Sequence, residues 1–174
     1  PSQSHNFWDF IETMKKYPSK NLRFAVNSNL GVNEKSIQRL IDATHELDIK
    51  EFDLYTSCEA FGEQAEYIRD GLNYQQWRAN LVNFLENANP KTFRALTIMM
   101  TINSLCLFSI IDFLEDMKLL KAKYGHHRPN LDLNILRWPA FMSPLALPDD
   151  VKIKLRSDLV KWYDENKDSD LFVQ

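Results

Sequence analysis

Small polar and charged side chains follow three apolar segments of this sequence. The segments are residues 22–26, 52–56 and 95–102, and the groups at or after their ends are Asn27, Ser28 and Asn29, then Thr56, Ser57 and Glu59, then Thr101, Asn103 and Ser104. If the segments are parallel strands, these groups collect at one edge of a sheet, where α/β proteins bind ligands. The same groups can instead cap the helices that follow. The spacing leaves both interpretations open.

Arg69 has the sharpest predicted role of any single residue. It lies between the segment that ends at Glu59 and a helix that begins near Tyr74. A guanidinium group offers a planar pair of donors that matches a carboxylate. We therefore consider a ligand carboxylate as its partner, with a surface ion pair to Glu66 or Asp70 as the alternative.

The two cysteines, Cys58 and Cys106, are too few for a disulfide framework. Both follow apolar runs, which favours reduced, intracellular thiols and a cytoplasmic protein. Cys58 could act as a nucleophile if a histidine served as its base. Because no histidine has an evident partner role, we interpret both cysteines as small packing residues, Cys106 above all.

Short motifs for nucleotide or metal sites are missing from the sequence. There is no G-x-G-x-x-G, no Walker pattern, no Cys-x-x-Cys and no His-Glu-x-x-His. The adjacent pair His126 and His127 is interpreted as loop surface. We therefore assign no catalytic residue and no complete metal site within the chain.

The composition describes an ordinary globular chain of 174 residues with a net charge of −3. That charge gives no general electrostatic argument for nucleic acid or membrane as a partner. No apolar stretch reaches the roughly 18 residues that a membrane-spanning helix needs.

Apolar spacing predicts alternating helices and strands. Helices are expected over 6–16, 33–47, 74–87, 109–121 and 149–163, and strands over 22–26, 52–56, 95–102 and 131–136. Asn6, Asn33 and Ser109 are predicted helix N-caps, and Gly125 is predicted to close the fourth helix. The strands read as apolar on both faces, which predicts an α/β fold with a parallel sheet covered by helices. Four strands cannot close an eight-stranded barrel, so an open doubly wound sheet and part of a larger barrel remain the choices.

The same residues resemble the middle of the radical S-adenosylmethionine (radical SAM) enzymes. In that family a strand ends in Ser and acidic residues, as in Thr56-Ser-Cys-Glu59, and an arginine beside a glycine follows, as in Arg69-Asp-Gly71. Phe24-Ala-Val-Asn-Ser-Asn-Leu30 is similar to the third barrel strand. Thr97-Ile-Met-Met-Thr-Ile-Asn103 resembles the fifth strand, and Leu133-Asn-Ile-Leu-Arg-Trp-Pro139 resembles the sixth.

The resemblance implies a fold, an activity and cofactors. The fold would be strands three to six of a partial (β/α)6 TIM-like barrel. A [4Fe–4S] cluster with ligands outside this chain would reductively cleave S-adenosylmethionine to a 5′-deoxyadenosyl radical, which abstracts hydrogen from a peptide or small-molecule substrate. A reductase would supply the electron. The implied cofactor-binding residues are Asn27, Ser28, Ser57, Arg69, Asn103, Arg137 and Trp138.

The resemblance also predicts which parts of the family's fold the sequence begins and ends in. Pro1 to Phe7 matches the part of the family's Gly-Gly-Glu-Pro motif from its proline onward, so we expect the cluster-binding part to be missing and the fragment to be inactive. Residues 1–148 would be the truncated barrel. Residues 149–174 would be a C-terminal helix and tail that start an extension like the family's short "twitch" domain.

Two other classes of protein compete with this interpretation. In a non-enzymatic α/β binding or scaffold module, the polar strand ends would only cap helices. A fragment of a TIM-barrel-like hydrolase would need a base or a set of metal ligands that we do not find in the sequence.

Overall fold

The computed structural model describes residues 4–125 and 128–169 of the chain. Its elements, in order, are α1 (His5–Lys16), β1 (Ser19–Asn27), α2 (Glu34–Glu46), β2 (Ile49–Ser57), α3 (Gly62–Ile68), α4 (Tyr74–Asn87), β3 (Phe93–Ile102), η1 (Cys106–Phe108), α5 (Ile110–Tyr124), β4 (Asn130–Ile135), η2 (Ala140–Met142), η3 (Pro144–Ala146) and α6 (Asp149–Asn166). The predictions for His126 and His127, for the start of the motif match at residues 1–3 and for the end of the tail at residues 170–174 lie outside the described residues.

The four strands form one parallel sheet in the order β1-β2-β3-β4. The predicted α/β class and the parallel pairing are therefore confirmed. Because neighbours in the sheet are also neighbours in sequence, the chain steps across the sheet in a single direction. β1 and β4 are the two edge strands of the described sheet.

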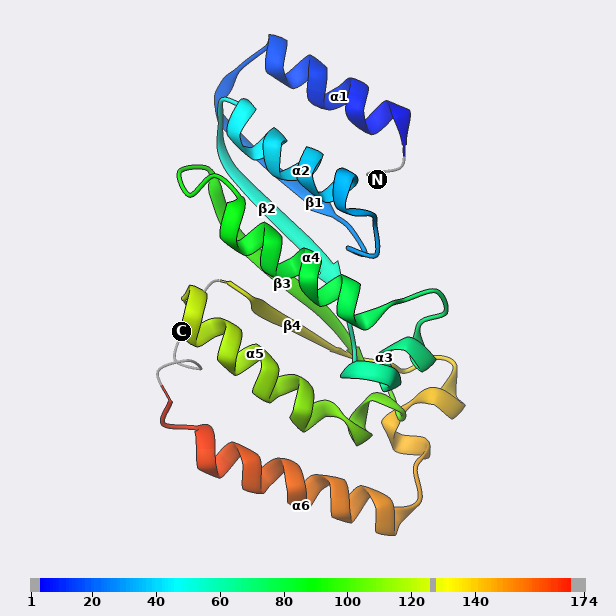
Figure 1. Cartoon of the computed structure of the whole chain (residues 1–174). Coiled ribbons are helices and arrows are strands. Elements are labelled where there is room, and N and C mark those ends of the chain that lie inside the picture. Colours follow the sequence, from blue (N-terminus) through cyan, green and yellow to red (C-terminus); the bar gives the residue numbers. More distant parts are fainter. Residues whose placement is uncertain (1–3, 126–127, 170–174) are drawn as a thin grey trace.

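The helices α1, α2, α4 and α5 lie over the same face of this sheet (Figure 1). That face carries Phe52 on β2, whose ring lies 6.0 Å from that of Phe84 on α4. Phe84 in turn meets Phe93 on β3 edge-on at 5.1 Å. Full burial of such aromatic side chains contributes roughly 1.5–3 kcal/mol each, so this face of the sheet forms the core.

The opposite face of the sheet is polar, and this corrects the expectation that the strands are apolar on both sides. Side chains alternate along a strand, so Glu51, Asp53, Tyr55 and Ser57 of β2 point away from the helices. Arg94 of β3 pairs there with Asp53 at 2.5 Å and with Glu51 at 3.3 Å. Each strand carries side chains for the helix-covered face and side chains for the polar face. The composition of the apolar segments did not show which residues belong to which face.

All the predicted helices and strands are present. At six of the eight strand ends, the strand is one to three residues longer than predicted. Asn33 caps α2 by accepting a hydrogen bond from Ser36 N at 2.9 Å. Gly125 ends α5 with a φ of 93°, a conformation that glycine adopts at little cost. The prediction for Asn6 was wrong, because Ser4 is the residue that precedes α1. Ser109 is the N-cap residue of α5, as predicted, but its hydroxyl accepts from Phe61 N and makes no capping bond to the helix.

The connection predicted after Glu59 contains a short helix, α3. Ala65 is its buried residue. α3 ends at Arg69, whose backbone N–H donates to Ala65 O at 3.0 Å. This short helix determines where the Arg69 side chain begins.

The last helix, α6, lies beside α5 (Figure 1). Trp162 Nε1 donates to Glu115 of α5 at 2.6 Å, and Lys118 Nζ donates to Asn166 at 2.6 Å. Leu159 packs against the core. Within the described residues, no helix is both long enough and apolar enough to cross a membrane.

Candidate functional site

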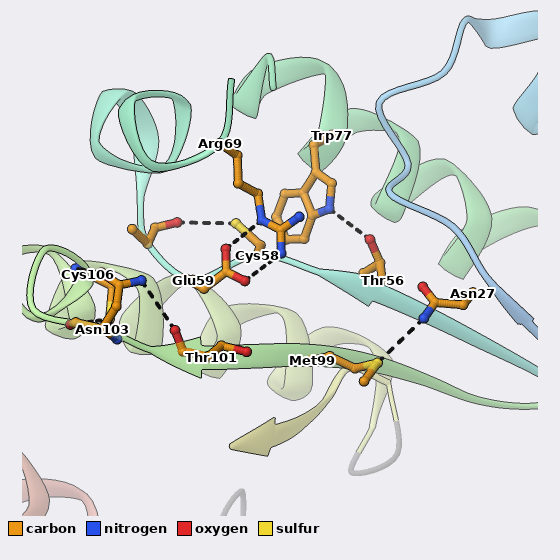
Figure 2. A network of polar contacts seen from close by, with 11 residues as sticks. Asn27, Thr56, Cys58, Glu59, Arg69, Trp77, Met99, Thr101, Asn103 and Cys106 are labelled. Carbon is orange, nitrogen blue, oxygen red and sulfur yellow. Dashed lines mark hydrogen bonds and ion pairs between the residues drawn. The ribbon is translucent and has the colours of Figure 1, made fainter. Parts of the chain in front are cut away.

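The C-terminal ends of β1, β2 and β3 lie at one edge of the sheet, as the sequence predicts. Asn27 at the end of β1 is in register with Tyr55, and Ser57 at the end of β2 is in register with Met99. The Asn27 side chain reaches across β2 and donates from Nδ2 to Met99 Sδ at 3.8 Å. Figure 2 shows Asn27 and Met99 together with Glu59, Arg69 and Asn103, which follow the strands.

Arg69 and Glu59 form the strongest polar contact at this edge. Arg69 Nε donates to Glu59 Oε2 and Nη2 donates to Oε1, each at 2.5 Å (Figure 2). The Glu59 side chain is 6% exposed and that of Arg69 35%. The hydrogen bond to Glu59 raises the pKa of Arg69, so the guanidinium stays charged at every physiological pH.

The predicted alternative partners of Arg69 were wrong. Glu66 instead accepts a hydrogen bond from Tyr74 N at 2.8 Å and so fixes the start of α4. Glu59 was recognised only as a strand-end group. Its role as partner of Arg69 depends on α3, which turns the chain back over the strand end.

A shallow cleft of about 240 Å³ opens beside this ion pair. The residues that line it are Glu59, Ile68, Arg69, Thr101, Asn103 and Leu136. Two of the three guanidinium nitrogens of Arg69 are bound to Glu59. The third, Nη1, makes no hydrogen bond within the described residues, so it could meet an anionic group in the cleft.

The side chains of Asn103 and Ser28 are used within the fold. Asn103 Oδ1 accepts from Leu105 N at 2.9 Å and from Cys106 N at 3.0 Å, which holds the turn into η1. Ser28 is buried, and its hydroxyl accepts from Leu30 N at 3.3 Å. Both side chains therefore stabilise local turns, although neither is the N-cap residue of the helix that follows, and the Asn103 side chain still lines the cleft.

Ser57, Arg137 and Trp138 have freer side chains. The Ser57 hydroxyl makes no hydrogen bond in the part of the chain that the structure describes, and it is half-buried on the polar face. Arg137 and Trp138 follow β4 and are exposed, Trp138 to 81%. Neither residue lines the cleft; the residue of this segment that does is Leu136.

Both cysteines are fully buried, as their interpretation as packing residues requires. The Cys58 thiol donates to Ala60 O at 3.3 Å, and the Cys106 thiol donates to Asn103 O at 3.2 Å. Burial raises the pKa of Cys58 to about 12 and that of Cys106 to about 11. Both thiols stay protonated at neutral pH, so neither has the thiolate character of a nucleophile or a metal ligand.

Across residues 4–125 and 128–169, no three His, Cys, Asp or Glu side chains come together in a group that could hold a metal ion. The polar groups at the sheet edge can therefore bind through hydrogen bonds and through the charge of Arg69. Comparison with models of known protein families, with curated proteins and with solved structures finds no match to this chain.

Proposed function

We propose that this chain is the S-adenosylmethionine-binding portion of a radical SAM enzyme. The observation that carries the proposal is the Arg69–Glu59 pair at the C-terminal edge of the sheet, beside a cleft that Thr101 and Asn103 also line. Glu59 holds the arginine in one orientation through Nε and Nη2 and leaves Nη1 without a hydrogen-bond partner among the described residues. A fixed, permanently charged guanidinium suits the methionine carboxylate of S-adenosylmethionine.

The arrangement of the sheet supports the partial-barrel part of the proposal. Strands in sequential order with helices over one face are what a (β/α) barrel segment requires. Parallel sheets usually have both faces covered, whereas here the second face is polar. In a partial barrel that polar face would line the interior, with Ser57 and Asn27 near its opening.

The residues present do not fit an iron–sulfur cluster. Cluster iron is held by thiolates, and both cysteines in this chain are buried, protonated thiols. We therefore assign no cluster ligand here. In the proposed enzyme a cluster would supply the electron that cleaves S-adenosylmethionine and so starts hydrogen abstraction from the substrate.

The turn-stabilising hydrogen bonds of Ser28 and Asn103 favour a second candidate, a non-enzymatic α/β binding or scaffold domain. There the polar strand ends stabilise turns, and the Arg69–Glu59 pair only fixes α3. This candidate predicts no affinity for S-adenosylmethionine, so binding measurements separate the two.

The test is calorimetric titration of the chain with S-adenosylmethionine. We expect Arg69→Ala to weaken binding about 10-fold or more, since a charge-assisted hydrogen bond contributes roughly 1.5–3 kcal/mol. Arg78→Ala is the matched control, because Arg78 makes an equivalent fork with Asp116, at 2.5 and 2.7 Å, between α4 and α5. Equal affinity in wild type and Arg69→Ala, or no binding to a folded wild-type chain, would reject the proposal.

A further inference from the structure

The outer side of β4 is an unpaired strand edge. β4 pairs with β3 on one side, and no other strand among the described residues pairs with it on the other. Its last four residues, from Asp132 to Ile135, are exposed. Because side chains alternate along a strand, these four residues are exposed on both faces of the sheet. The helix layer therefore leaves this end of β4 uncovered.

Alternate residues of β4 point their backbone groups away from β3. Leu136 N donates to β3 at 2.8 Å, so the N–H of this residue points inward. The direction alternates along a parallel strand, and Leu131, Leu133 and Ile135 therefore point outward. Ile135 N already accepts a local partner, the Asn134 side chain, to which it donates at 2.8 Å. Leu131 and Leu133 make no hydrogen bond on the outer side within the described residues, so each offers a donor and an acceptor to an added strand.

The two faces of β4 define the side chains that would suit such a strand. Leu133 and Ile135 lie on the helix-covered face and are 55% and 58% exposed. Asp132 lies on the polar face, in register with Met99, and makes no ion pair or hydrogen bond with another described residue. Side chains of paired residues lie side by side on the same face of a sheet. A complementary strand therefore has apolar residues on one face and a cation on the other.

The opposite edge of the sheet is less suited to an added strand. The register of β1 with β2 shifts between Ser19 and Arg23, and Lys20 lies within this irregular stretch. Irregular pairing and basic side chains are means by which proteins protect strand edges. β4 has an unbroken register with β3 and contains neither a basic residue nor a proline.

We propose that the outer edge of β4 binds an extended segment of another polypeptide, which adds to the sheet as a further strand. The free backbone groups of Leu131 and Leu133 call for an extended backbone as their partner. Asp132 calls for a lysine or arginine beside it, and a second copy of β4 would bring another carboxylate instead. The inference does not depend on the function proposed for the C-terminal edge of the sheet.

The experiment is an NMR titration of the isotope-labelled chain with the peptide acetyl-Thr-Val-Lys-Val-Thr-Val-Thr-amide. This peptide has valines on one face and its lysine on the other. We expect the resonances of β4 to shift, and hydrogen exchange at the Leu131 and Leu133 amides to slow at least about tenfold as these amides become hydrogen-bonded. The Ala25 amide, on the outer edge of β1, should exchange as before.

Two N-methylated peptides test the backbone pairing without altering the protein. One is methylated at its valines, and the other at its lysine and inner threonine. Because alternate residues of an added strand face β4, one form should bind at least about fivefold more weakly than the other. Loss in the valine form would show antiparallel pairing, and loss in the other form parallel pairing.

A matched pair of variants tests the two edges. Leu133→Pro removes an outward N–H and should weaken peptide binding about fivefold or more, while the bonds of β4 to β3 remain. Ala25→Pro does the same on β1, where Ser28 N donates to β2 and Ala25 N therefore points outward. It should leave binding unchanged. Circular dichroism confirms that both variants are folded.

A charge exchange tests the role of Asp132. Asp132→Lys should weaken the lysine peptide by up to about fivefold, and a peptide with glutamate in place of lysine should regain this affinity. The proposal is overturned if the peptide changes nothing at β4 of the folded wild type, if both methylated forms bind equally, or if Leu133→Pro or Asp132→Lys binds as wild type does. It is equally overturned if wild type is a dimer in which the Leu131 and Leu133 amides are already protected, which would assign this edge to a second copy.

Discussion

Glu59 and Arg69 face one another through two parallel hydrogen bonds of 2.5 Å at the C-terminal edge of the sheet. Glu59 follows the end of β2 by two residues, and Arg69 directly follows the short helix α3. The pair therefore closes the loop between β2 and α4 and fixes Arg69 beside the cleft. Glu59 is more buried than Arg69. Substituting the two residues should therefore change the free energy of unfolding by different amounts.

Arg69→Ala should destabilise the protein by about 2 kcal/mol, less than the ~3–5 kcal/mol of a fully buried pair because Arg69 is one-third exposed. Glu59→Gln should cost about 1 kcal/mol, since the amide keeps the shape and arginine can still reach water. Urea unfolding monitored by tryptophan fluorescence measures both. A larger loss in Glu59→Gln than in Arg69→Ala would contradict this account.

Thr56→Val should destabilise the fold by roughly 1–3 kcal/mol, the cost of leaving a buried donor without its partner. Thr56 and Trp77 are both fully buried, and Trp77 Nε1 donates to Thr56 Oγ1 at 3.0 Å. Thr97→Val is the matched control, because Thr97 is half-buried on the polar face of the neighbouring strand. Thermal or urea unfolding of the two variants should differ, and equal losses would show that the bond contributes little.

Stability should fall as the pH rises above about 9. Burial raises the pKa of Cys58 from its ordinary value of 9.0 to about 12. The folded chain therefore keeps a proton that the unfolded chain loses. This contribution is complete below pH 9 and declines through the interval up to about pH 12, by at most ~1.4 kcal/mol per pH unit.

The matched comparison is Cys58→Ala, which removes this thiol. Between about pH 8 and about pH 10 its free energy of unfolding should decline by roughly 1 kcal/mol less than that of wild type. Identical pH profiles for the two proteins would show that the Cys58 thiol is accessible or already ionised in the fold.

Incubation of the chain with ferrous iron and sulfide under anaerobic conditions should not produce the visible absorbance of a [4Fe–4S] cluster. Both thiols are buried and hold their protons, and cluster assembly needs several accessible thiolates. Iron and acid-labile sulfide analysis after desalting measures the outcome. A stoichiometric cluster that Cys58→Ala or Cys106→Ala removes would show that the fold opens to supply ligands.

Parts of the site could be predicted from the sequence because they depend on the order of residues along the chain. Polar residues after each β-prone run predicted the edge at which Asn27, Ser57 and Asn103 lie. Arg69 was identified by its place between a strand and a helix. Its partner was not, because the segment that forms α3 was interpreted as an open connection. The position of Arg69 at the end of this helix is what brings it to Glu59.

A groove along α6, which residues of η1 and η3 also line, could not be predicted in the same way. The sequence predicts the helix from Asp149 onward, and its exposed stripe can be drawn from the spacing of Lys152, Arg156 and Val160. Whether the stripe is covered depends on where η3 and α5 place the helix, which is a property of the assembled chain.

By itself, the sequence determined the alternation of strands and helices, the parallel sheet and the burial of both cysteines, because these follow from apolar periodicity along the chain. Only the tertiary structure decided that one face of the sheet is polar, that Glu59 rather than Glu66 holds Arg69, and that Asn103 stabilises the turn before η1. The physical reason is that hydrogen bonds and ion pairs join residues that are distant in sequence, and the fold chooses among partners whose chemistry is equally suitable.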